Sequence, residues 1–522
     1  MEPLEERAML SVCVWDGDGG DNRWSNPANW RAGVTPSAND DLVFGLAALT
    51  ETENDLPAGT AFRSLWFLSQ DYSIAGNSLG VTSRILVGPW TAGATIAADL
   101  ALLGAVEATI VGGPLSLSGV VSGSGSLTEN GNGVLIVSAG ATFTGNATIQ
   151  DGATLRFACP DALPSGPSAG MVEVNGTLDL AGYSATVNGL SGDGLITSSA
   201  TGPVTLSVDT TGQSTTFSGV IEDGAGRVAL TTLGTGTLTL TGRNTLTGEV
   251  TVDAGSTLKL GSASALCADP EVNGTLDLAG YSTTLDGLWG SGTVTSSVAG
   301  AVTLTVDTTN YPGTFSGVIE DGSGTMSLAK TGAGTLTLAG ANTYSGGTTI
   351  SSGTLRVGSG GSSGTLGSGA VVNNAALEFY RSGTTTVANA ISGSGTLTQT
   401  LGTLVLTGSN TYTGTTTIAP WSWESATIQV GNGGTTGTLG SGTVTSSGDY
   451  ESCAQLVYKR SDGVTVSNAV TGQVNVTIAS GSTLKAGGSS ACGLPNGTSG
   501  TGRRDDQRHA SILPATARPW GS

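Results

Sequence analysis

The chain repeats itself over long stretches, and this duplication constrains its fold more than any local motif. The segment VNGTLDLAGYS at 174–184 returns unchanged at 272–282, an offset of 98 residues (272 − 174). The segment TFSGVIEDG at 216–224 returns at 314–322 with the same offset. Two long blocks therefore share one register, which is typical of arrays whose units stack on their neighbours.

A short strand-like motif recurs inside the blocks. GTLTL stands at 236–240 and at 334–338, and the looser copy GTLVL follows at 402–406. Leucine and threonine alternate with period two, so Leu336 is predicted to face the core and Thr337 to face water. Threonine is β-branched and suits strands, and its hydroxyl suits a wet outer face.

These patterns predict an all-β chain that forms a right-handed parallel β-helix, or solenoid. Each strand is too short to enclose a core alone, whereas coils stacked about 4.8 Å apart pair every backbone with the coils on either side. Parallel crossovers favour the right hand. Glycine supplies 84 of the 522 residues, and Gly and Asn are expected to turn the corners with positive φ. An antiparallel array would need regular two-residue hairpins, which the variable glycine spacing does not provide.

The sequence that joins each strand to its following turn resembles a known repeat. The pattern is clearest at 332–349, GAGTLTLAGANTYSGGTT, and it is similar to the autotransporter-associated β-strand repeat of bacterial surface proteins. Copies are expected near 123–156, 231–260, 329–358 and 396–430. The resemblance implies a β-helical passenger region that is secreted or lies on the cell surface, is tied to adhesion or display, and brings no catalytic residues.

The chain is expected to have four parts. These are an export-type motif at 1–13, an irregular aromatic-rich cap at 14–99, the solenoid repeats at 100–490 and a disordered tail at 491–522. The first part resembles the L-E-x-R-x-L-L-S motif of exported bacterial proteins, with Met9 in a leucine position. A complete autotransporter ends in a membrane β-barrel of alternating strands, and no such alternation follows the repeats. The sequence therefore does not predict the route of export or the anchor.

Tryptophan gathers near the N-terminus, where Trp15, Trp24 and Trp30 lie close together. One interpretation is a cap, since large aromatic side chains can cover the open end of a first coil. The alternative is a carbohydrate-active or carbohydrate-binding protein, because tryptophan faces stack on pyranose rings. The three residues are the candidates for sugar stacking, and a polysaccharide is the corresponding candidate partner.

An acidic run in the same segment makes Asp16, Asp18 and Asp21 candidate calcium ligands. Counted from Asp16, an EF-hand loop would need glycine at its sixth position and glutamate at its twelfth, but Asp21 and Pro27 stand there. An irregular site that also uses the acidic pair at 40–41 remains as the alternative.

The residues of the repeat body do not predict catalysis. The single histidine, His509, lies in the tail, so histidine-based triads and histidine-rich metal centres are excluded from the body. The carboxylate pairs at 222–223 and 320–321 recur identically in both blocks, as turn residues do, so we interpret them as solvated turns rather than as a hydrolytic pair. No cofactor is predicted.

Charge and cysteine usage further restrict the possible functions and partners. The net charge of −20 and the lack of a basic stripe argue against nucleic acid as a binding partner. The sequence contains no stretch of 18 apolar residues, so it predicts no transmembrane helix. The scattered cysteines are expected to fill the core: Cys13, Cys159, Cys267, Cys453 and Cys492. The sequence thus predicts a non-enzymatic secreted or cell-surface protein, structural or adhesive, whose extracellular partner it does not identify.

Overall fold

The computed structural model describes residues 11–166, 168–420, 424–447, 453–479 and 482–486. Its regular elements are β-strands, apart from the short 3-10 helix η1 (Pro27–Asn29). In these ranges no helix has the length and apolar character that crossing a bilayer requires. Most of the export-type motif expected at 1–13 and the whole tail expected at 491–522 lie outside the described residues.

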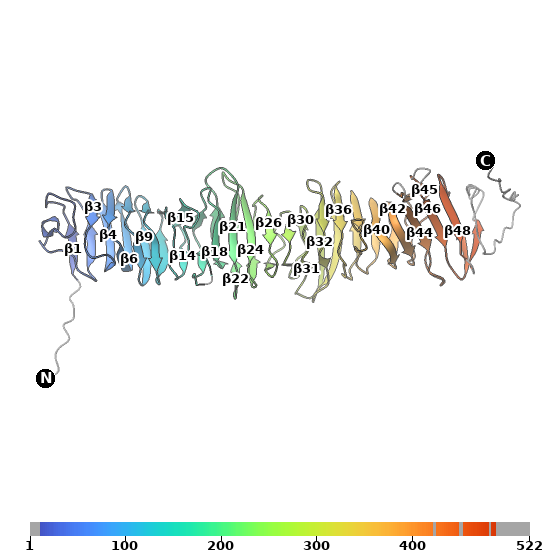
Figure 1. Ribbon diagram of the computed structural model, residues 1–522, viewed down its shortest axis with the longest axis horizontal. Coiled ribbons are helices and arrows are strands. Elements are labelled where there is room, and N and C mark those ends of the chain that lie inside the picture. The colour runs from blue at the N-terminus through green and yellow to red at the C-terminus, as the bar shows by residue number, and fades with distance from the viewer. Residues whose placement is uncertain (1–10, 167, 421–423, 448–452, 480–481, 487–522) are drawn as a thin grey trace, which may run out of the picture. The chain divides into compact units, whose positions relative to one another are not determined.

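The chain divides into two compact units. Unit 1 comprises Met1–Leu285 and Trp289–Val298, and unit 2 comprises Asp286–Leu288 and Ala299–Ser522. Each unit is a parallel β-solenoid in which successive strands of a sheet come from successive coils (Figure 1).

Two parallel sheets form most of unit 1. Sheet 1 holds β1 (Val12–Trp15), β2 (Asp41–Phe44), β4 (Thr60–Ser69), β6 (Leu79–Trp90), β9 (Ala105–Ile110), β12 (Ser126–Gly131), β14 (Ala147–Ile149), β16 (Val172–Val174) and β19 (Leu190–Ser191), with β8 (Leu100–Leu102) and β11 (Val121–Gly123) beside them. Sheet 2 holds β3 (Glu51–Asn54), β5 (Tyr72–Gly76), β7 (Ala94–Ile96), β10 (Leu115–Leu117), β13 (Val134–Val137), β15 (Thr154–Phe157), β17 (Thr177–Asp179), β20 (Leu195–Thr197) and β23 (Val220–Ile221).

Two further sheets begin later in unit 1. Sheet 3 holds β18 (Ala185–Asn188), β21 (Val204–Asp209), β24 (Val228–Leu233), β26 (Val250–Val252) and β28 (Glu271–Val272). Sheet 4 holds β22 (Ser214–Phe217), β25 (Thr237–Leu240), β27 (Thr257–Leu260), β29 (Thr275–Asp277) and β31 (Thr293–Thr295), and β30 (Thr283–Leu285) also lies in unit 1.

Unit 2 repeats this construction. Sheet 5 holds β32 (Ala301–Asp307), β35 (Thr325–Thr331), β37 (Thr348–Ile350), β39 (Val371–Asn373) and β41 (Ile391–Ser392). Sheet 6 holds β33 (Gly313–Phe315), β36 (Thr335–Leu338), β38 (Thr354–Val357), β40 (Ala376–Val387), β42 (Thr396–Leu406), β44 (Ser425–Val430), β46 (Cys453–Tyr458) and β48 (Val474–Ile478), with β43 (Thr416–Ile418) and β45 (Val444–Ser446) beside them. The remaining strands are β34 (Val318–Ile319) and the pair β47 (Gly463–Val466) and β49 (Thr483–Ala486).

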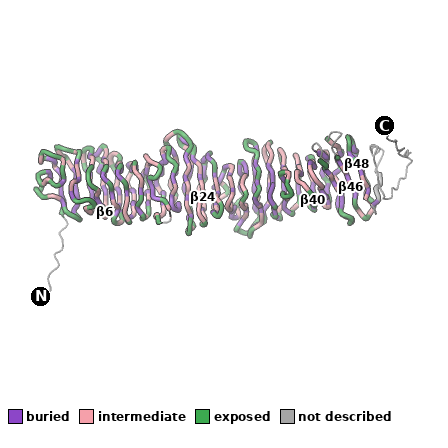
Figure 2. The backbone as a smooth tube through the Cα atoms, in the orientation of Figure 1, coloured by how far each residue is buried: buried purple, intermediate pink, exposed green. Residues whose placement is uncertain are grey.

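The core of each unit is a set of stacked aliphatic columns. In sheet 2, Leu115 pairs with Leu135 and Leu135 pairs with Leu155, and all three are at most 1% exposed. In sheet 6, Leu336 and Leu355 continue the same arrangement and are fully buried. Buried and half-exposed residues alternate along the strands (Figure 2), as the period-two pattern predicts.

Residues 14–99 are built into the same stack. Their strands β1, β2, β4 and β6 belong to sheet 1, and β6 pairs in parallel with both β8 and β9. The sheet therefore continues across the boundary that we expected at 99/100.

Glycine turns the corners as predicted, whereas the asparagine of the repeated turn motif does not. Gly332 has φ +73°, and a Cβ there would lie 2.4 Å from the backbone nitrogen of Thr309, so no other residue fits without strain. Asn342, in the repeated turn motif, is instead buried inside the coil at 4% exposed. Non-glycine residues with positive φ in the described ranges are confined to Asn39, Gln70, Ala181 and Ala279.

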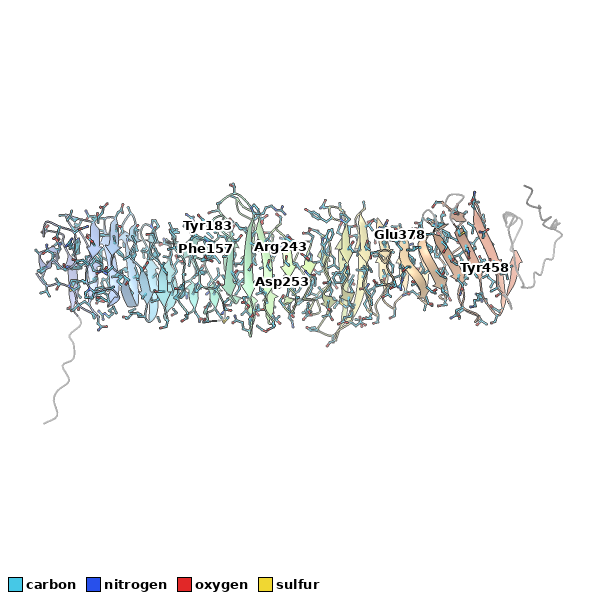
Figure 3. The ribbon with its side chains drawn as sticks, viewed as in Figure 1. Phe157, Tyr183, Arg243, Asp253, Glu378 and Tyr458 are labelled. Carbon is cyan, nitrogen blue, oxygen red and sulfur yellow. The ribbon has the colours of Figure 1, made fainter. Side chains whose placement is uncertain are left out.

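The expectation that Thr337 faces water is wrong. Thr337 is only 6% exposed, although it alternates with the inward Leu336. In the outward ladder it is paired with Thr314 and with the long side chain of Arg356. Arg356 is held in place by an ion pair to Glu378, with Nε 2.9 Å from Oε2. Glu378 is labelled in Figure 3. The outward side of a strand is thus not open to solvent at every position.

The cysteines are mostly not core fillers. Cys13 is buried, Cys159 is half-buried, and Cys267 and Cys453 are exposed, so the expectation is wrong for the last two. Cys492 lies outside the described residues.

Candidate functional site

The three N-terminal tryptophans form one aromatic cluster in the first coils of unit 1. Trp15 lies on β1, and the Trp30 ring packs edge-on against it and against Trp24, with centroid distances of 5.1 and 6.0 Å. Phe44 on β2 packs against Trp24 at 5.9 Å. Trp15 Nε1 donates a hydrogen bond to the carbonyl of Leu49 at 2.8 Å, and Trp30 Nε1 donates to the carbonyl of Trp24 at 2.9 Å.

This packing leaves the three indoles no face for a sugar. Trp15 and Trp24 are 0% exposed and Trp30 is 2% exposed. Stacking on a pyranose needs a ring face that solvent can reach. The assignment of these residues as sugar-stacking candidates is therefore wrong, because all three fill the hydrophobic core where sheet 1 begins.

The calcium candidates serve a hydrogen-bonded loop. Asp21 Oδ1 accepts hydrogen bonds from Asn29 Nδ2 at 2.8 Å and from Asn26 Nδ2 at 3.2 Å. Hydrogen bonds from the Asn26 side chain, the Arg23 backbone and the Asn29 side chain hold the pKa of Asp21 below its usual value. Asp16 Oδ1 lies 3.5 Å from the backbone nitrogen of Asp18. Within the described ranges no three acidic, histidine or cysteine side chains come together as a metal-binding group, so these aspartates are not assembled into a calcium site.

The acidic pair at 40–41 has partners of its own. Asp40 Oδ2 accepts a hydrogen bond from the backbone N–H of Ser37 at 2.8 Å, and Ser11 donates to Asp40 Oδ1. Asp41 forms an ion pair with Arg63. Asp40 thus joins the first coil to the second, and Asp41 joins the second to the third.

The repeated turn carboxylates fasten neighbouring coils. Asp223 Oδ1 accepts hydrogen bonds from the backbone N–H groups of Val228 and Thr247, at 2.8 and 3.1 Å. Asp321 Oδ1 accepts from Met326 at 2.7 Å and from Ser345 at 3.2 Å in the equivalent geometry. Burial opposes ionisation, but these hydrogen bonds hold the pKa of both aspartates below the usual value. A general acid needs the opposite shift, and these hydrogen bonds make the two aspartates more than simply solvated turn residues.

The sequence analysis missed a polar position inside the coil that recurs in the repeats. Glu129, Thr232, Lys330 and Gln399 each stand inside the coil, two or three residues before a corner glycine, and are at most 1% exposed. Lys330 Nζ donates to the carbonyls of Thr331, Gly332 and Ser352 at 2.7, 2.9 and 3.0 Å. Gln399 likewise donates to the corner carbonyls of Leu401 and Gly402, whereas Thr232 shares a hydrogen bond with Ser256 Oγ. Aligning the repeats by their GTLTL motifs would have found the position.

A second interior position binds three coils together. Asn342 Oδ1 accepts from the backbone N–H of Ile319, one coil earlier, at 2.8 Å. Asn342 Nδ2 donates to the carbonyl of Thr365, one coil later, also at 2.8 Å. Asn244 and Asn410 make the equivalent pairs of bonds. The asparagine of the repeated turn motif is therefore a bridge between coils.

Comparison with known families identifies these repeats. The sequence pattern of the passenger-associated-transport-repeat family matches residues 123–157, 230–260, 328–357 and 401–419. The first three matches each span four successive strand positions, for example β24 to β27 in the second. The matches fall on the four expected copies, and each of the first three includes the interior polar residue, the strand that follows it and the next turn.

The chain is also similar in sequence to one curated protein. The chain is 33% identical over 365 residues to the adhesin BmaC autotransporter of Brucella suis biovar 1 (strain 1330). The match covers 66% of this chain and 9% of the relative, so the chain spans a small part of that protein's length. No solved structure gave a significant match. Four segments of this parallel β-solenoid are thus similar to passenger-associated-transport repeats.

Proposed function

We propose that this chain acts outside the cell as a structural and adhesive surface protein, without enzymatic activity. The observation that carries the proposal is the set of four passenger-associated-transport repeats on a parallel solenoid. The 33% identity to a protein named as an adhesin supports the adhesive role. A surface or secreted location follows from the same two comparisons.

The geometry is suited to presenting a surface. Outward threonines form ladders along successive coils, for example Thr237 on Thr257 and Thr257 on Thr275. Such ladders offer one hydroxyl per coil, and weak contacts repeated along a stack can add up to strong attachment. The repeated carboxylates Asp223 and Asp321 are committed to their turns, which supports a non-enzymatic role.

An adhesion assay tests this proposal. The chain is displayed on non-adherent bacterial cells, and attachment to epithelial monolayers and to abiotic surfaces is counted. We expect attachment to rise severalfold over cells that display the variant Leu238→Asp at equal density, because that variant disrupts the core of its coil. Equal attachment by both strains would contradict an adhesive role.

A second measurement addresses enzymatic activity. The purified chain is incubated with a panel of polysaccharides, and the release of reducing ends is followed. We expect no release above that of a heat-denatured sample. Depolymerisation of any member of the panel would overturn the non-enzymatic part of the proposal.

A further inference from the structure

An apolar column runs along the outer face of sheet 1 in the early coils. Val43 on β2 pairs with Trp66 on β4, and Trp66 pairs with Leu86 on β6. These residues alternate with the buried Leu65 and Phe67, so they lie on the outward side. Trp66 and Leu86 are half-buried, which leaves part of each side chain open to solvent.

A largely exposed indole lies farther along β6, four residues after Leu86. Trp90, at the end of β6, is 82% exposed, more than any other large apolar side chain in the described ranges. Its register partner is Ser69, which follows the exposed Leu68 on β4. Trp15, Trp24 and Trp30 stabilise the core because they are buried. Trp90 makes no comparable contribution, so its position on the surface needs another explanation.

A polar network borders the apolar column on the other side. Arg84 pairs with Glu107 one coil later, and Arg84 Nη2 lies 3.3 Å from Glu107 Oε1. Glu107 Oε1 also accepts hydrogen bonds from Asn130 Nδ2 at 2.9 Å and from Thr109 Oγ1 at 3.2 Å. All three bonds go to one oxygen, and within the described ranges no hydrogen bond reaches Oε2. The network is half-exposed, so a ligand can reach this oxygen and the guanidinium.

The charge of the surface selects among ligands. Arg84 and Glu107 balance each other, so the site itself is neutral. The whole chain carries a net charge of −20, which repels anionic polymers. A neutral ligand that is apolar on one face and rich in hydroxyl groups at its edge matches this surface, and a pyranose ring has this form.

We infer that the outer face of sheet 1 binds a neutral oligosaccharide, with Trp66, Leu86 and Trp90 beneath the sugar rings and Arg84, Glu107 and Asn130 bonding to their hydroxyls. The aromatic and aliphatic side chains contact the C–H faces of the rings. Glu107 Oε2 accepts a hydrogen bond from a hydroxyl, while the Arg84 guanidinium donates to a ring or hydroxyl oxygen. The inference rests on the proposed adhesive function and names the chemistry of its ligand.

Binding to defined sugars tests the inference. The full chain is titrated with neutral tetrasaccharides of glucose, mannose, galactose and N-acetylglucosamine, and binding is followed by calorimetry and by tryptophan fluorescence. We expect at least one class to bind and Trp90→Ala to weaken that binding about tenfold, the loss of one stacking contact. Glu107→Gln keeps the shape of the side chain but removes its charge, and it should weaken binding severalfold.

A matched control removes an exposed aromatic elsewhere. Tyr311 is 45% exposed in unit 2, and Tyr311→Ala should leave the affinity within about twofold, inside the scatter of such measurements. Unchanged circular dichroism for all three variants shows that the coils are intact. Absence of binding to every neutral sugar, or affinity that survives both Trp90→Ala and Glu107→Gln, would overturn the inference.

Adhesion assays separate this inference from the proposed function. If the purified chain binds sugar but displaying cells do not attach, the adhesive function is contradicted and the sugar site is supported. If cells attach and Trp90→Ala does not reduce attachment, the adhesive function is supported but the sugar site is not its cause. Capture of a protein ligand by the wild type but not by Trp90→Ala, with no sugar binding, would replace the oligosaccharide with a protein partner.

Discussion

Glu129 and Lys330 occupy equivalent places in two repeats, and these oppositely charged side chains both lie inside the coil. They are 1% and 0% exposed, respectively. Lys330 Nζ is surrounded by three backbone carbonyls, and burial lowers its pKa to about 8. Glu129 Oε1 accepts one hydrogen bond from the backbone N–H of Leu135 at 3.0 Å, and Oε2 has no partner in the described ranges. Burial raises the pKa of Glu129 to about 8.

The stability of the coils around Glu129 should depend on pH. The folded chain binds this proton more tightly than the unfolded chain, whose carboxyl titrates near 4.5. The stabilisation is therefore complete below about pH 4.5 and is lost as the pH rises through about 8. We expect hydrogen exchange of β12 and β13 to accelerate between pH 5 and 8 by about tenfold or more beyond the intrinsic increase.

Glu129→Gln should remove this dependence. Gln399 already stands at the equivalent position, where its Nε2 donates to the carbonyl of Leu401 at 2.6 Å, so the repeat accepts an amide there. The same pH dependence in wild type and variant would contradict the assignment of the titration to Glu129.

Loss of an asparagine bridge should destabilise three coils at once. Asn342→Ala leaves the N–H of Ile319 and the carbonyl of Thr365 without their side-chain partner inside the coil. A buried polar group without a partner costs about 1–3 kcal/mol, so we expect a loss of about 2–5 kcal/mol in the free energy of unfolding, measured in urea. Asn310→Ala, at an exposed position of the same unit, should change it by less than about 0.5 kcal/mol. Equal midpoints for the two variants would show that the bridge has no energetic role.

A new carboxylate should destabilise the fold strongly on the inward side of β25 and only slightly on the outward side. Leu238 is fully buried in the column with Leu258, so Leu238→Asp buries a carboxylate without a partner and should cost more than about 3 kcal/mol. Thr239 is half-exposed and pairs with Lys259, so Thr239→Asp should cost less than about 1 kcal/mol. Thermal unfolding followed by circular dichroism compares them, and similar midpoints would contradict the inward and outward assignment.

One corner glycine should be irreplaceable where another is not. Gly332 has φ +73°, and a Cβ would lie 2.3 Å from Asp307 Oδ1 and 2.4 Å from the backbone nitrogen of Thr309. Gly332→Ala combines backbone strain with these overlaps and should cost at least about 2 kcal/mol in urea unfolding. Gly361 has an ordinary φ and no atom within 4 Å of the added Cβ, so Gly361→Ala should be neutral to within about 0.5 kcal/mol. If both variants unfold at the same urea concentration, steric demand does not explain the corner.

The solenoid could be predicted from sequence because its signal repeats. The alternation around Leu336 and the 98-residue offset from 174–184 to 272–282 report the stacking directly. Inward positions were therefore predictable, but exposure on the outward side was not. Thr337 is covered although it lies on the outward side beside Arg356 of the next coil, and the sequence alone does not state which coils are neighbours.

The candidate site could not be predicted in the same way. Tryptophan density pointed to Trp15, Trp24 and Trp30, yet these are buried, while Trp90 is exposed. Exposure depends on which side of a strand a residue takes, and the bulges between β4 and β6 break the simple alternation there. The pairing of Trp66 with Leu86 likewise becomes visible only once the register is known.

The asparagine bridges also determine what a growing end of the stack requires. Asn342 takes its N–H donor from the coil that precedes it and its carbonyl acceptor from the coil that follows. A chain that folds from one terminus therefore carries a single half-satisfied amide of this kind, on its newest coil, and the next coil completes it. The same completion is required at Asn244 and Asn410, so each of these three coils depends on the coil that follows it.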